Sequence, residues 1–328
     1  MTGINSQMNL ISDLFNGYEE AATRSGFGEA MSELGHTNED VVALCADLSG
    51  SLKLGDFIKK WPERFFQSGV AEQNMVGMAT GLALSGKIPF ATSFGVFMPM
   101  RTIDQIRISV CYNKANVKLA ASHTGITVGP DGATHQALED IAMMRVLPNM
   151  TVLAPSDRIE TKKATLYAAE TIGPVYIRFG RQNAPVYTTE ETPFEGGKIN
   201  LLKEGGDVAI VACGRMVYES LLAAKELSAD GIEAKVLNCH TIKPIDSDAL
   251  VSAADECGAV VTAEEHQKIG GLGSAVAEVL SVLKPVPMEL VGVDDSFGES
   301  GESDELMSKY GLTSGDIKKA VKRVLKNK

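Results

Sequence analysis

Short apolar segments alternate with longer segments of helical periodicity along almost the whole chain. The first apolar runs are VVALCADL, RFFQSGV, IPFATSF, VKLAASH, MTVLAPS and PVYIRFG. Segments of helical length lie between several of them, over 72–86, 100–114, 135–148 and 157–172. Continuous apolar strands separated by helices predict a parallel sheet that is covered on both faces. We therefore expect an α/β fold whose first domain has a largely parallel six-stranded sheet.

The alternation pauses once and then resumes. Proline, threonine, glutamate and glycine crowd without periodicity between about Gln182 and Gly206, which is typical of a connection between domains. Apolar runs and helical segments return after it, and 328 residues suffice for two domains. We predict two doubly wound α/β domains, the second one smaller. The expected bounds are an N-terminal extension over 1–13, a first domain over 14–190, a linker over 191–206 and a second domain over 207–328.

The charge of the chain limits its partners. A formal net charge of -11 argues against nucleic acid or an anionic membrane as the main partner, since both need a basic face. No apolar run reaches membrane-spanning length, and the N-terminus lacks a basic segment followed by an apolar one. The five cysteines have no CxxC spacing and lie mostly in apolar runs, so we expect buried free thiols. These features favour a cytoplasmic protein.

Two segments are expected to be purely structural. Asp157 and Glu160 have the spacing of a helix N-cap and its partner three residues later. The C-terminal segment 314–326 is expected to form a surface helix with its basic face in water.

Polar and aromatic residues follow the ends of the first-domain strands. Ligands of open parallel sheets bind in the crevice at the carboxyl ends of the strands, so these side chains could converge on one rim. The candidates are Asp47 with Ser51, Glu72, Phe94 with Phe97, His123, Asp131 with His135, and Arg181.

Glu72 stands at the start of a segment that is otherwise apolar. It could simply be an N-terminal acid that the helix dipole favours. However, the helix that follows is apolar on all faces, which predicts that it is buried all round. Burial raises the pKa of a carboxyl group while the dipole lowers it, and we expect burial to prevail. Such a carboxyl group can share a proton with a ligand nitrogen.

The loop SHTGITVGPDGATHQ carries two histidines and one aspartate between a strand and a helix. A metal site is a weak interpretation, because His123 and His135 match no common ligand spacing. Binding of an oxygen-rich substrate and proton transfer suit them better, although ordinary loop histidines remain an alternative. Arg24, Arg178 and Arg181 could be solvated side chains, or bidentate phosphate ligands if they lie at the crevice.

Several separated motifs resemble the transketolase family over nearly the whole chain. GVAEQNMVGMATGLALSGKIPFATSF, SHTGITVGPDGATHQALEDIAMMRVLPNMTVLAPSD and PVYIRFGRQN resemble its pyrimidine-binding domain. EEHQKIGGLGSAVAE resembles its C-terminal domain. The resemblance implies an active site built between two protein surfaces. One surface holds the diphosphate of thiamine diphosphate and a divalent metal, and the other holds the aminopyrimidine ring.

The resemblance implies roles for the cofactor-binding residues. Glu72 matches the glutamate that shares a proton with the ring nitrogen and so promotes loss of the thiazolium proton. Phe94 and Phe97 match the aromatic residues that pack on the ring. Asp47 matches an acid near the cofactor at the subunit interface. Met100 stands where many members have a further aromatic residue.

The resemblance also implies a substrate site. Residues that match sugar-phosphate ligands are Arg24, Ser51, His123 and Arg181. Asp131 matches an acid that recognises a hydroxyl group beside the carbonyl, and His135 matches a histidine that contacts the reacting oxygen. Pro130 replaces a more usual acid. Together these matches imply transfer of a two-carbon ketol unit from a ketose phosphate to an aldose phosphate. His266 is given no catalytic role, and no residue of this chain is expected to bind a metal.

The motif that holds metal and diphosphate in this family is missing: the chain has no GDG followed by the later asparagine. The resemblance therefore implies a split enzyme, in which an N-terminal-half subunit holds the diphosphate with Mg2+ or Ca2+. We expect a homodimeric core with two copies of each subunit. The alternatives are a deoxyxylulose-phosphate synthase-like subunit, a 2-oxo acid dehydrogenase β-like subunit or a non-catalytic scaffold.

Overall fold

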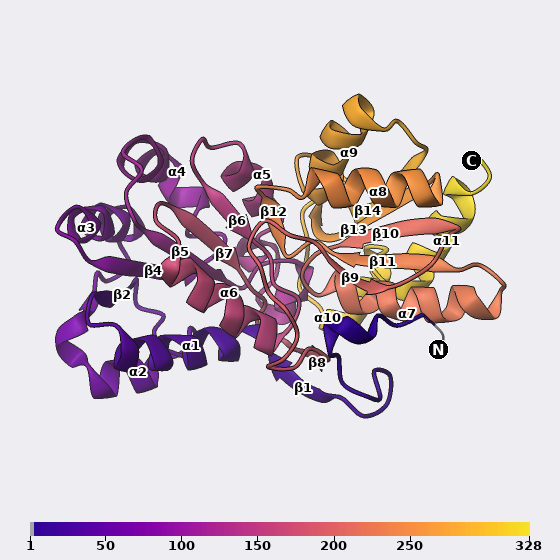
Figure 1. The fold of residues 1–328 in the computed structure, drawn as a ribbon. Coiled ribbons are helices and arrows are strands. Elements are labelled where there is room, and N and C mark those ends of the chain that lie inside the picture. The colour runs from indigo at the N-terminus through magenta and orange to yellow at the C-terminus, as the bar shows by residue number, and fades with distance from the viewer. Residues whose placement is uncertain (1–2) are drawn as a thin grey trace.

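The computed structural model describes residues 3–328, which fold into two α/β lobes side by side (Figure 1). The first lobe is built on a seven-stranded sheet in the order β12-β6-β7-β5-β4-β2-β3. Its strands are β2 Val41–Cys45, β3 Phe65–Gln67, β4 Ile88–Phe94, β5 Lys118–Ser122, β6 Thr151–Leu153, β7 Val175–Arg178 and β12 Thr241–Lys243. All neighbours pair in parallel except β12 with β6.

The six predicted strands of this sheet are confirmed, and a seventh is added at one edge. Strand β12 comes from the sequence of the second domain and pairs antiparallel with β6, Thr241 facing Leu153. With three residues, β12 is too short to show as a periodic run. It extends the first sheet with a strand of the second domain.

Helices cover both faces of the first sheet, as the apolar strands predict. They are α1 Thr23–Thr37, α2 Gly55–Lys60, α3 Glu72–Leu84, α4 Ile103–Gln105, α5 Asp140–Arg145 and α6 Arg158–Glu170. Side chains of α1, α2 and α6 share one buried cluster with Phe90, whereas α3 and α5 share another with Ala91. The successive residues Phe90 and Ala91 of β4 therefore pack against helices on opposite faces of the sheet.

Two predicted helices are less regular than expected. The segment 100–114 is a 3₁₀ turn at Met100–Thr102, then α4, then a π-helix at Ile106–Tyr112. Of 135–148, the α-helical part is α5 alone. A 3₁₀ turn at Ala133–His135 precedes it, followed by an extended Gln136. The Gln136 side chain donates hydrogen bonds to the carbonyl oxygens of Ile126 and Glu299.

The prediction that α3 is buried on all faces was wrong for this chain. Met75, Val76 and Ala79 are fully buried. On the other side, Gly77 and Gly81 face open space and Leu84 is exposed. The reason is position: α3 packs on β4 at the end of the first lobe far from the second (Figure 1), so the rest of this chain covers one side of the helix.

The second lobe has a five-stranded sheet in the order β14-β13-β10-β11-β9. Its strands are β9 Asn200–Lys203, β10 Val208–Ala212, β11 Ala234–Asn238, β13 Val260–Gln267 and β14 Met288–Val293, and its helices are α7 Met216–Ala229, α8 Ser247–Cys257, α9 Leu272–Leu283, α10 Ser303–Lys309 and α11 Ser314–Val324. Strand β9 pairs antiparallel with β11 and lies inside the segment 191–206. The smaller second α/β domain is thus present, with an antiparallel edge strand.

The lobes are joined by shared secondary structure and a common core. Strand β12, from the sequence of the second domain, completes the first sheet, and the N-terminal Asn5 N–H donates to the Leu202 carbonyl oxygen of β9 at 2.9 Å. Within the first domain, strand β1 (Glu19–Ala22) pairs antiparallel with β8 (Asn183–Val186). One buried apolar cluster contains side chains of both sheets, including Val152 and Val211. The domains therefore form one packed body.

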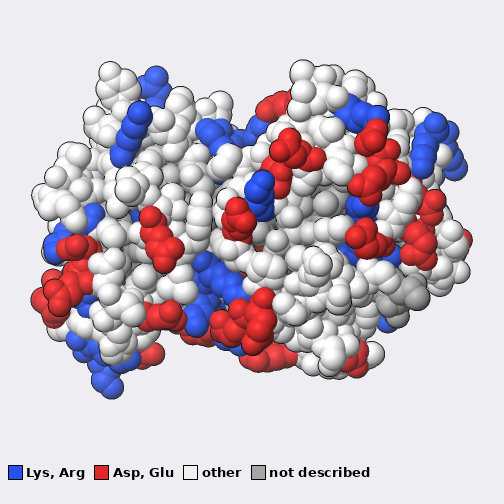
Figure 2. Space-filling view, in the orientation of Figure 1, with Lys and Arg blue, Asp and Glu red and all other residues white. Residues whose placement is uncertain are grey.

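Other structural expectations are met. The Asp157 carboxylate accepts the Glu160 N–H at 2.9 Å and caps α6. All five cysteines are buried and free. Helix α11 buries Ile317, Ala320, Val321 and Val324 and exposes lysines. Within residues 3–328 no helix combines the length and apolarity needed to cross a membrane. Acidic and basic side chains are interspersed on the face in Figure 2.

Candidate active site

Glu72 is the first residue of α3 and follows β3 through the connection 68–71. Its side chain is buried, with 5% exposure, but it is not isolated. Arg101 Nη1 donates to Glu72 Oε1 at 3.3 Å, and the Arg101 side chain is half exposed. The Gln73 side chain also donates to the Arg101 carbonyl oxygen at 3.0 Å. The buried Glu72 carboxylate is therefore separated from solvent by the half-exposed side chain of Arg101.

Two stacked phenylalanines are linked to this carboxylate through Arg101. Phe94 ends β4, and its ring stacks on Phe97 with a centroid distance of 5.7 Å and an interplanar angle of 21°. The turn needs glycine at position 95, because a Cβ there would come within 2.6 Å of the Ala137 Cβ. The Arg101 guanidinium lies 4.1 Å from the Phe97 ring centroid. Arg101 thus contacts both the carboxylate and the aromatic pair.

The two loop histidines meet the same aromatic pair. His123 stacks on Phe94 with centroids 3.6 Å apart, and His135 meets Phe97 edge-on at 5.4 Å. Burial lowers the pKa of His123 to about 3, assisted by the positive charges of Arg24 and Arg181 and by His135. His123 is therefore a neutral imidazole near neutral pH, with Nδ1 2.9 Å from the Ser122 hydroxyl.

Arginines lie beyond His123. Arg24 Nη1 donates to the Ser51 carbonyl oxygen at 3.0 Å. Arg181 Nη1 donates to the Val128 carbonyl oxygen at 2.8 Å and lies 3.4 Å from an Asp131 carboxylate oxygen. Because burial and the charge of Arg181 together lower the pKa of Arg24, the two guanidinium groups act on each other.

These contacts, together with the effect of the Arg24 and Arg181 charges on the pKa of His123, relate most of the predicted site residues to one another. We call this set the site array. It runs from Glu72 through Arg101, the aromatic pair and the histidines to the two arginines with Ser51 and Asp131. Asp47 has a left-handed backbone and an exposed side chain. No hydrogen bond or ion pair among the described residues ties that side chain to the array. Met100 opens the 3₁₀ turn that carries Arg101.

The second domain holds the loop that carries Asp131. The Thr127 N–H donates to Glu265 Oε1 at 2.7 Å. Gly125, with φ +87°, lies so close to Glu265 that a Cβ would come within 2.2 Å of its carboxyl carbon. Sequence patterns did not identify Glu265 or Arg101, because neither directly follows a first-domain strand. The one available signal for Arg101 was its place in the loop after Phe94.

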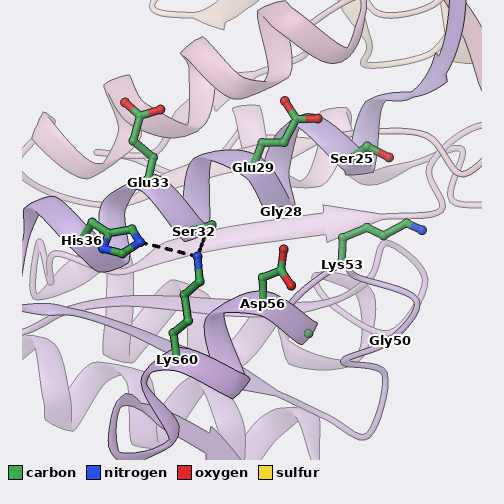
Figure 3. A pocket seen from close by; sticks show the side chains of 11 residues that line it. Ser25, Gly28, Glu29, Ser32, Glu33, His36, Gly50, Lys53, Asp56 and Lys60 are labelled. Carbon is green, nitrogen blue, oxygen red and sulfur yellow. Dashed lines mark hydrogen bonds between the residues drawn. The ribbon is translucent and has the colours of Figure 1, made fainter.

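A further cavity lies away from the site array. Its volume is about 680 Å³. It lies between α1, α2 and the loop at Gly50, and its lining includes three acids, two lysines and His36 (Figure 3). Lys60 Nζ of α2 lies 3.4 Å from Ser32 Oγ and 3.5 Å from His36 Nε2, both on α1. None of the predicted site residues lines this cavity.

No group of three or more His, Cys, Asp or Glu side chains in residues 3–328 is arranged to hold a metal ion. The part of the array that fits a flat heterocycle with ring nitrogens is the buried Glu72 carboxylate beside the aromatic pair. The part that fits an anion is the pair of arginines.

Comparison with known proteins identifies both domains. Residues 19–186 match the transketolase pyrimidine-binding domain, and residues 197–317 match the transketolase C-terminal domain. A putative transketolase C-terminal section from Methanocaldococcus jannaschii is 48% identical over 92% of this chain and 96% of its own length. The 6-deoxy-6-sulfo-D-fructose transketolase subunit SqwH from a Clostridium species is 46% identical over 94% and 96%.

A solved structure agrees with the sequence relatives. A split-gene transketolase, an inactive β4 tetramer, matches with a TM-score of 0.88 at 53% identity, covering 93% of this chain and 98% of its own. The fold and the two matched domains define an α/β transferase. The chain belongs to the transketolase family and corresponds to its C-terminal section. Members of this family generally depend on thiamine diphosphate.

Proposed function

We propose that this chain is the C-terminal subunit of a split transketolase. It would transfer a two-carbon ketol unit from a ketose phosphate to an aldose phosphate, together with an N-terminal-half subunit. The observation that carries the proposal is the site array. In it, a buried carboxylate, an aromatic pair, two histidines and two arginines are arranged in this order in space. Relatives of nearly the same length that are named as a C-terminal section and a transketolase subunit support it.

Thiamine diphosphate fits one end of the site array. Glu72, Phe94 and Phe97 would hold the aminopyrimidine ring, because a buried carboxylate can share a proton with a ring nitrogen and the aromatic pair offers a flat face. Asp47 and Met100 would complete this side. When bound, the cofactor supplies the nucleophilic carbon for the transfer, and the protein supplies orientation and a dry pocket. The diphosphate and Mg2+ or Ca2+ are assigned to the partner subunit.

The substrate would occupy the other end. Arg24, Arg181, Ser51 and neutral His123 would bind the phosphate of the sugar, since guanidinium groups bind phosphate in a bidentate manner. Asp131 would accept a hydrogen bond from a sugar hydroxyl. His135 would move a proton to or from the reacting oxygen. His123 would act by hydrogen bonding, because its lowered pKa keeps it neutral.

We assign the chain to an assembly with a homodimeric core and two copies of each subunit, in the cytoplasm. The exposed side of α3 supports an interface: Gly77 and Gly81 leave its backbone open, and Val70 and Leu84 nearby are exposed. Exposed apolar surface of this kind is typical of association sites. The related split-gene transketolase solved as a β4 tetramer also supports self-association.

The test is reconstitution. The purified chain, a separately expressed N-terminal-half transketolase subunit, thiamine diphosphate and Mg2+ should together transfer ketol units, and neither subunit should do so alone. Failure with partners from the same genome would favour a scaffold subunit. Turnover of pyruvate in place of a ketose phosphate would favour the synthase-like or dehydrogenase-like alternatives.

Substitution of Arg181 tests the substrate end. Arg181→Ala should lower kcat/KM for phosphorylated ketoses by about tenfold or more, because a charged hydrogen bond is lost. The loss of kcat/KM for the unphosphorylated analogues should be smaller. Equal losses for both classes would show that Arg181 does not bind phosphate.

A further inference from the structure

A third arginine, from the second domain, reaches the anion end of the site array. Arg215 directly precedes α7 and is half buried. It lines the same cavity of about 450 Å³ as Arg24 and Arg181. The other residues that line this cavity are Glu20, Gln182, Asn183, Glu302, Ser303 and Asp304. Three guanidinium groups from three separate segments thus share one open volume.

The positive charge in this cavity is only partly compensated. Within residues 3–328, Arg24 forms no ion pair, and its Nε is buried without a hydrogen-bond partner. Arg181 is paired with Asp131 at 3.4 Å. The three acids of the cavity are exposed, whereas the three arginines are partly buried. Water screens exposed carboxylates more strongly than half-buried guanidinium groups. The interior of the cavity therefore favours an anion.

Arg215 is held loosely. Its Nη1 lies 3.4 Å from the Asn183 carbonyl oxygen, and its Nη2 lies 3.4 Å from an Asp304 carboxylate oxygen. The Asp304 side chain is 93% exposed, and ion pairs with such exposed partners contribute little. A bound anion can therefore replace Asp304 as the partner of Arg215 at low cost.

We propose that Arg215 determines specificity for a dianionic substrate end. The proposal rests on the proposed function and adds the second domain to substrate recognition. A phosphate monoester carries about -1.5 to -2 charges at pH 7, whereas a sulfonate carries one. Arg24 and Arg181 suffice for a single negative charge, and Arg215 binds the second. The chain should therefore prefer a phosphate over a sulfonate at the end of an otherwise identical ketose.

The kinetic test uses the reconstituted enzyme with a ketose phosphate and the analogue in which a sulfonate replaces the phosphate. Arg215→Ala should lower the ratio of kcat/KM for the phosphate to kcat/KM for the sulfonate by about tenfold. Arg215→Lys should restore part of this preference for the phosphate. Asp304→Asn should change binding in the opposite direction and lower KM for the phosphate, because it removes the competing carboxylate. Arg323→Ala is the control, since Arg323 lies on α11 and pairs with Glu289 at 2.9 Å.

Binding to the chain without its partner gives a second readout. Inorganic phosphate should raise the melting temperature of the wild-type chain relative to chloride at equal ionic strength. Arg215→Ala should lose most of this gain, and Arg323→Ala should keep it. An unchanged specificity ratio in Arg215→Ala, or a wild-type chain that phosphate does not stabilise, overturns the inference. If the ratio is unchanged in Arg215→Ala but the wild-type enzyme transfers ketol units, the inference is wrong and the proposed function stands. A phosphate effect that needs Arg215 in an enzyme without ketol transfer would instead overturn the proposed function alone.

Discussion

Arg101 shields the buried carboxylate of Glu72 in this chain. Its guanidinium donates to Glu72 Oε1 at 3.3 Å and at the same time lies 4.1 Å from the centroid of the Phe97 ring. A guanidinium is planar and donates hydrogen bonds, as an aminopyrimidine ring does. Arg101 therefore satisfies the two groups that we assign to the cofactor ring, and a bound ring has to displace it.

Arg101→Ala should consequently tighten cofactor binding to the reconstituted enzyme. The half-exposed ion pair contributes about 1 kcal/mol at most, so the dissociation constant of thiamine diphosphate should fall up to about fivefold. Titration followed by protein fluorescence measures this. Arg107→Ala, a substitution in the π-helix that follows, is the control. Weaker binding by Arg101→Ala would show that Arg101 supports the ring instead of competing with it.

Substitution of His123 should leave the pH profile unchanged. Burial and the neighbouring positive charges lower the pKa of His123 to about 3, so the group is neutral from pH 5 upwards and cannot gain or lose a proton there. His123→Asn should lower kcat/KM by about tenfold through a lost hydrogen bond, with a profile parallel to the wild type between pH 5 and 8. His36→Asn, on the exposed side of α1, serves as the control.

A wild-type profile with a protonation step near pH 6 to 7 that disappears in His123→Asn would contradict this account. It would mean that the imidazole titrates in the complex and takes part as an acid or base.

Removal of Asp140 should destabilise the fold strongly. Asp140 accepts hydrogen bonds from Arg178 at 2.9 and 3.2 Å and from the Tyr176 hydroxyl at 2.7 Å, and all three groups are buried. Arg178 also donates to the Glu265 carbonyl oxygen and so links the domains. Asp140→Ala leaves a buried, uncompensated guanidinium, which costs about 3–5 kcal/mol of unfolding free energy.

Urea unfolding measures this cost. Asp40→Ala is the matched control, because Asp40 pairs with Lys87 at 2.8 Å on the surface, where loss of a pair costs less than about 1 kcal/mol. Similar losses for the two variants would show that the buried pair contributes no more than a surface one.

The sequence predicted those features that depend on local pattern. Six apolar runs became the six parallel strands of the first sheet, and residues after the strand ends, such as Phe94 and His123, came together at one rim. The short strand β12 escaped prediction because its three residues have no periodicity and their place depends on packing between domains.

The remaining site residues depend on long-range contacts. Arg101 and Arg215 reach the site through long side chains from positions that do not follow a first-domain strand, and Glu265 reaches it from the second domain. The apolar composition of α3 indicated burial on all sides, but a single chain covers one side only. A hydrophobic pattern indicates that a surface is buried, but it does not distinguish burial within one chain from burial against a second chain.

Hydrogen–deuterium exchange at the thiazolium carbon of bound thiamine diphosphate tests the central claim most directly. The claim is that the buried carboxylate of Glu72 shares a proton with the cofactor ring. The exchange is followed by NMR in the reconstituted enzyme, with Glu72→Gln as the variant and Glu63→Gln, whose side chain is largely exposed, as the control. We predict that Glu72→Gln slows the exchange by about a hundredfold or more, whereas Glu63→Gln leaves it unchanged. Exchange near the wild-type rate in a folded, cofactor-bound Glu72→Gln enzyme would contradict the account.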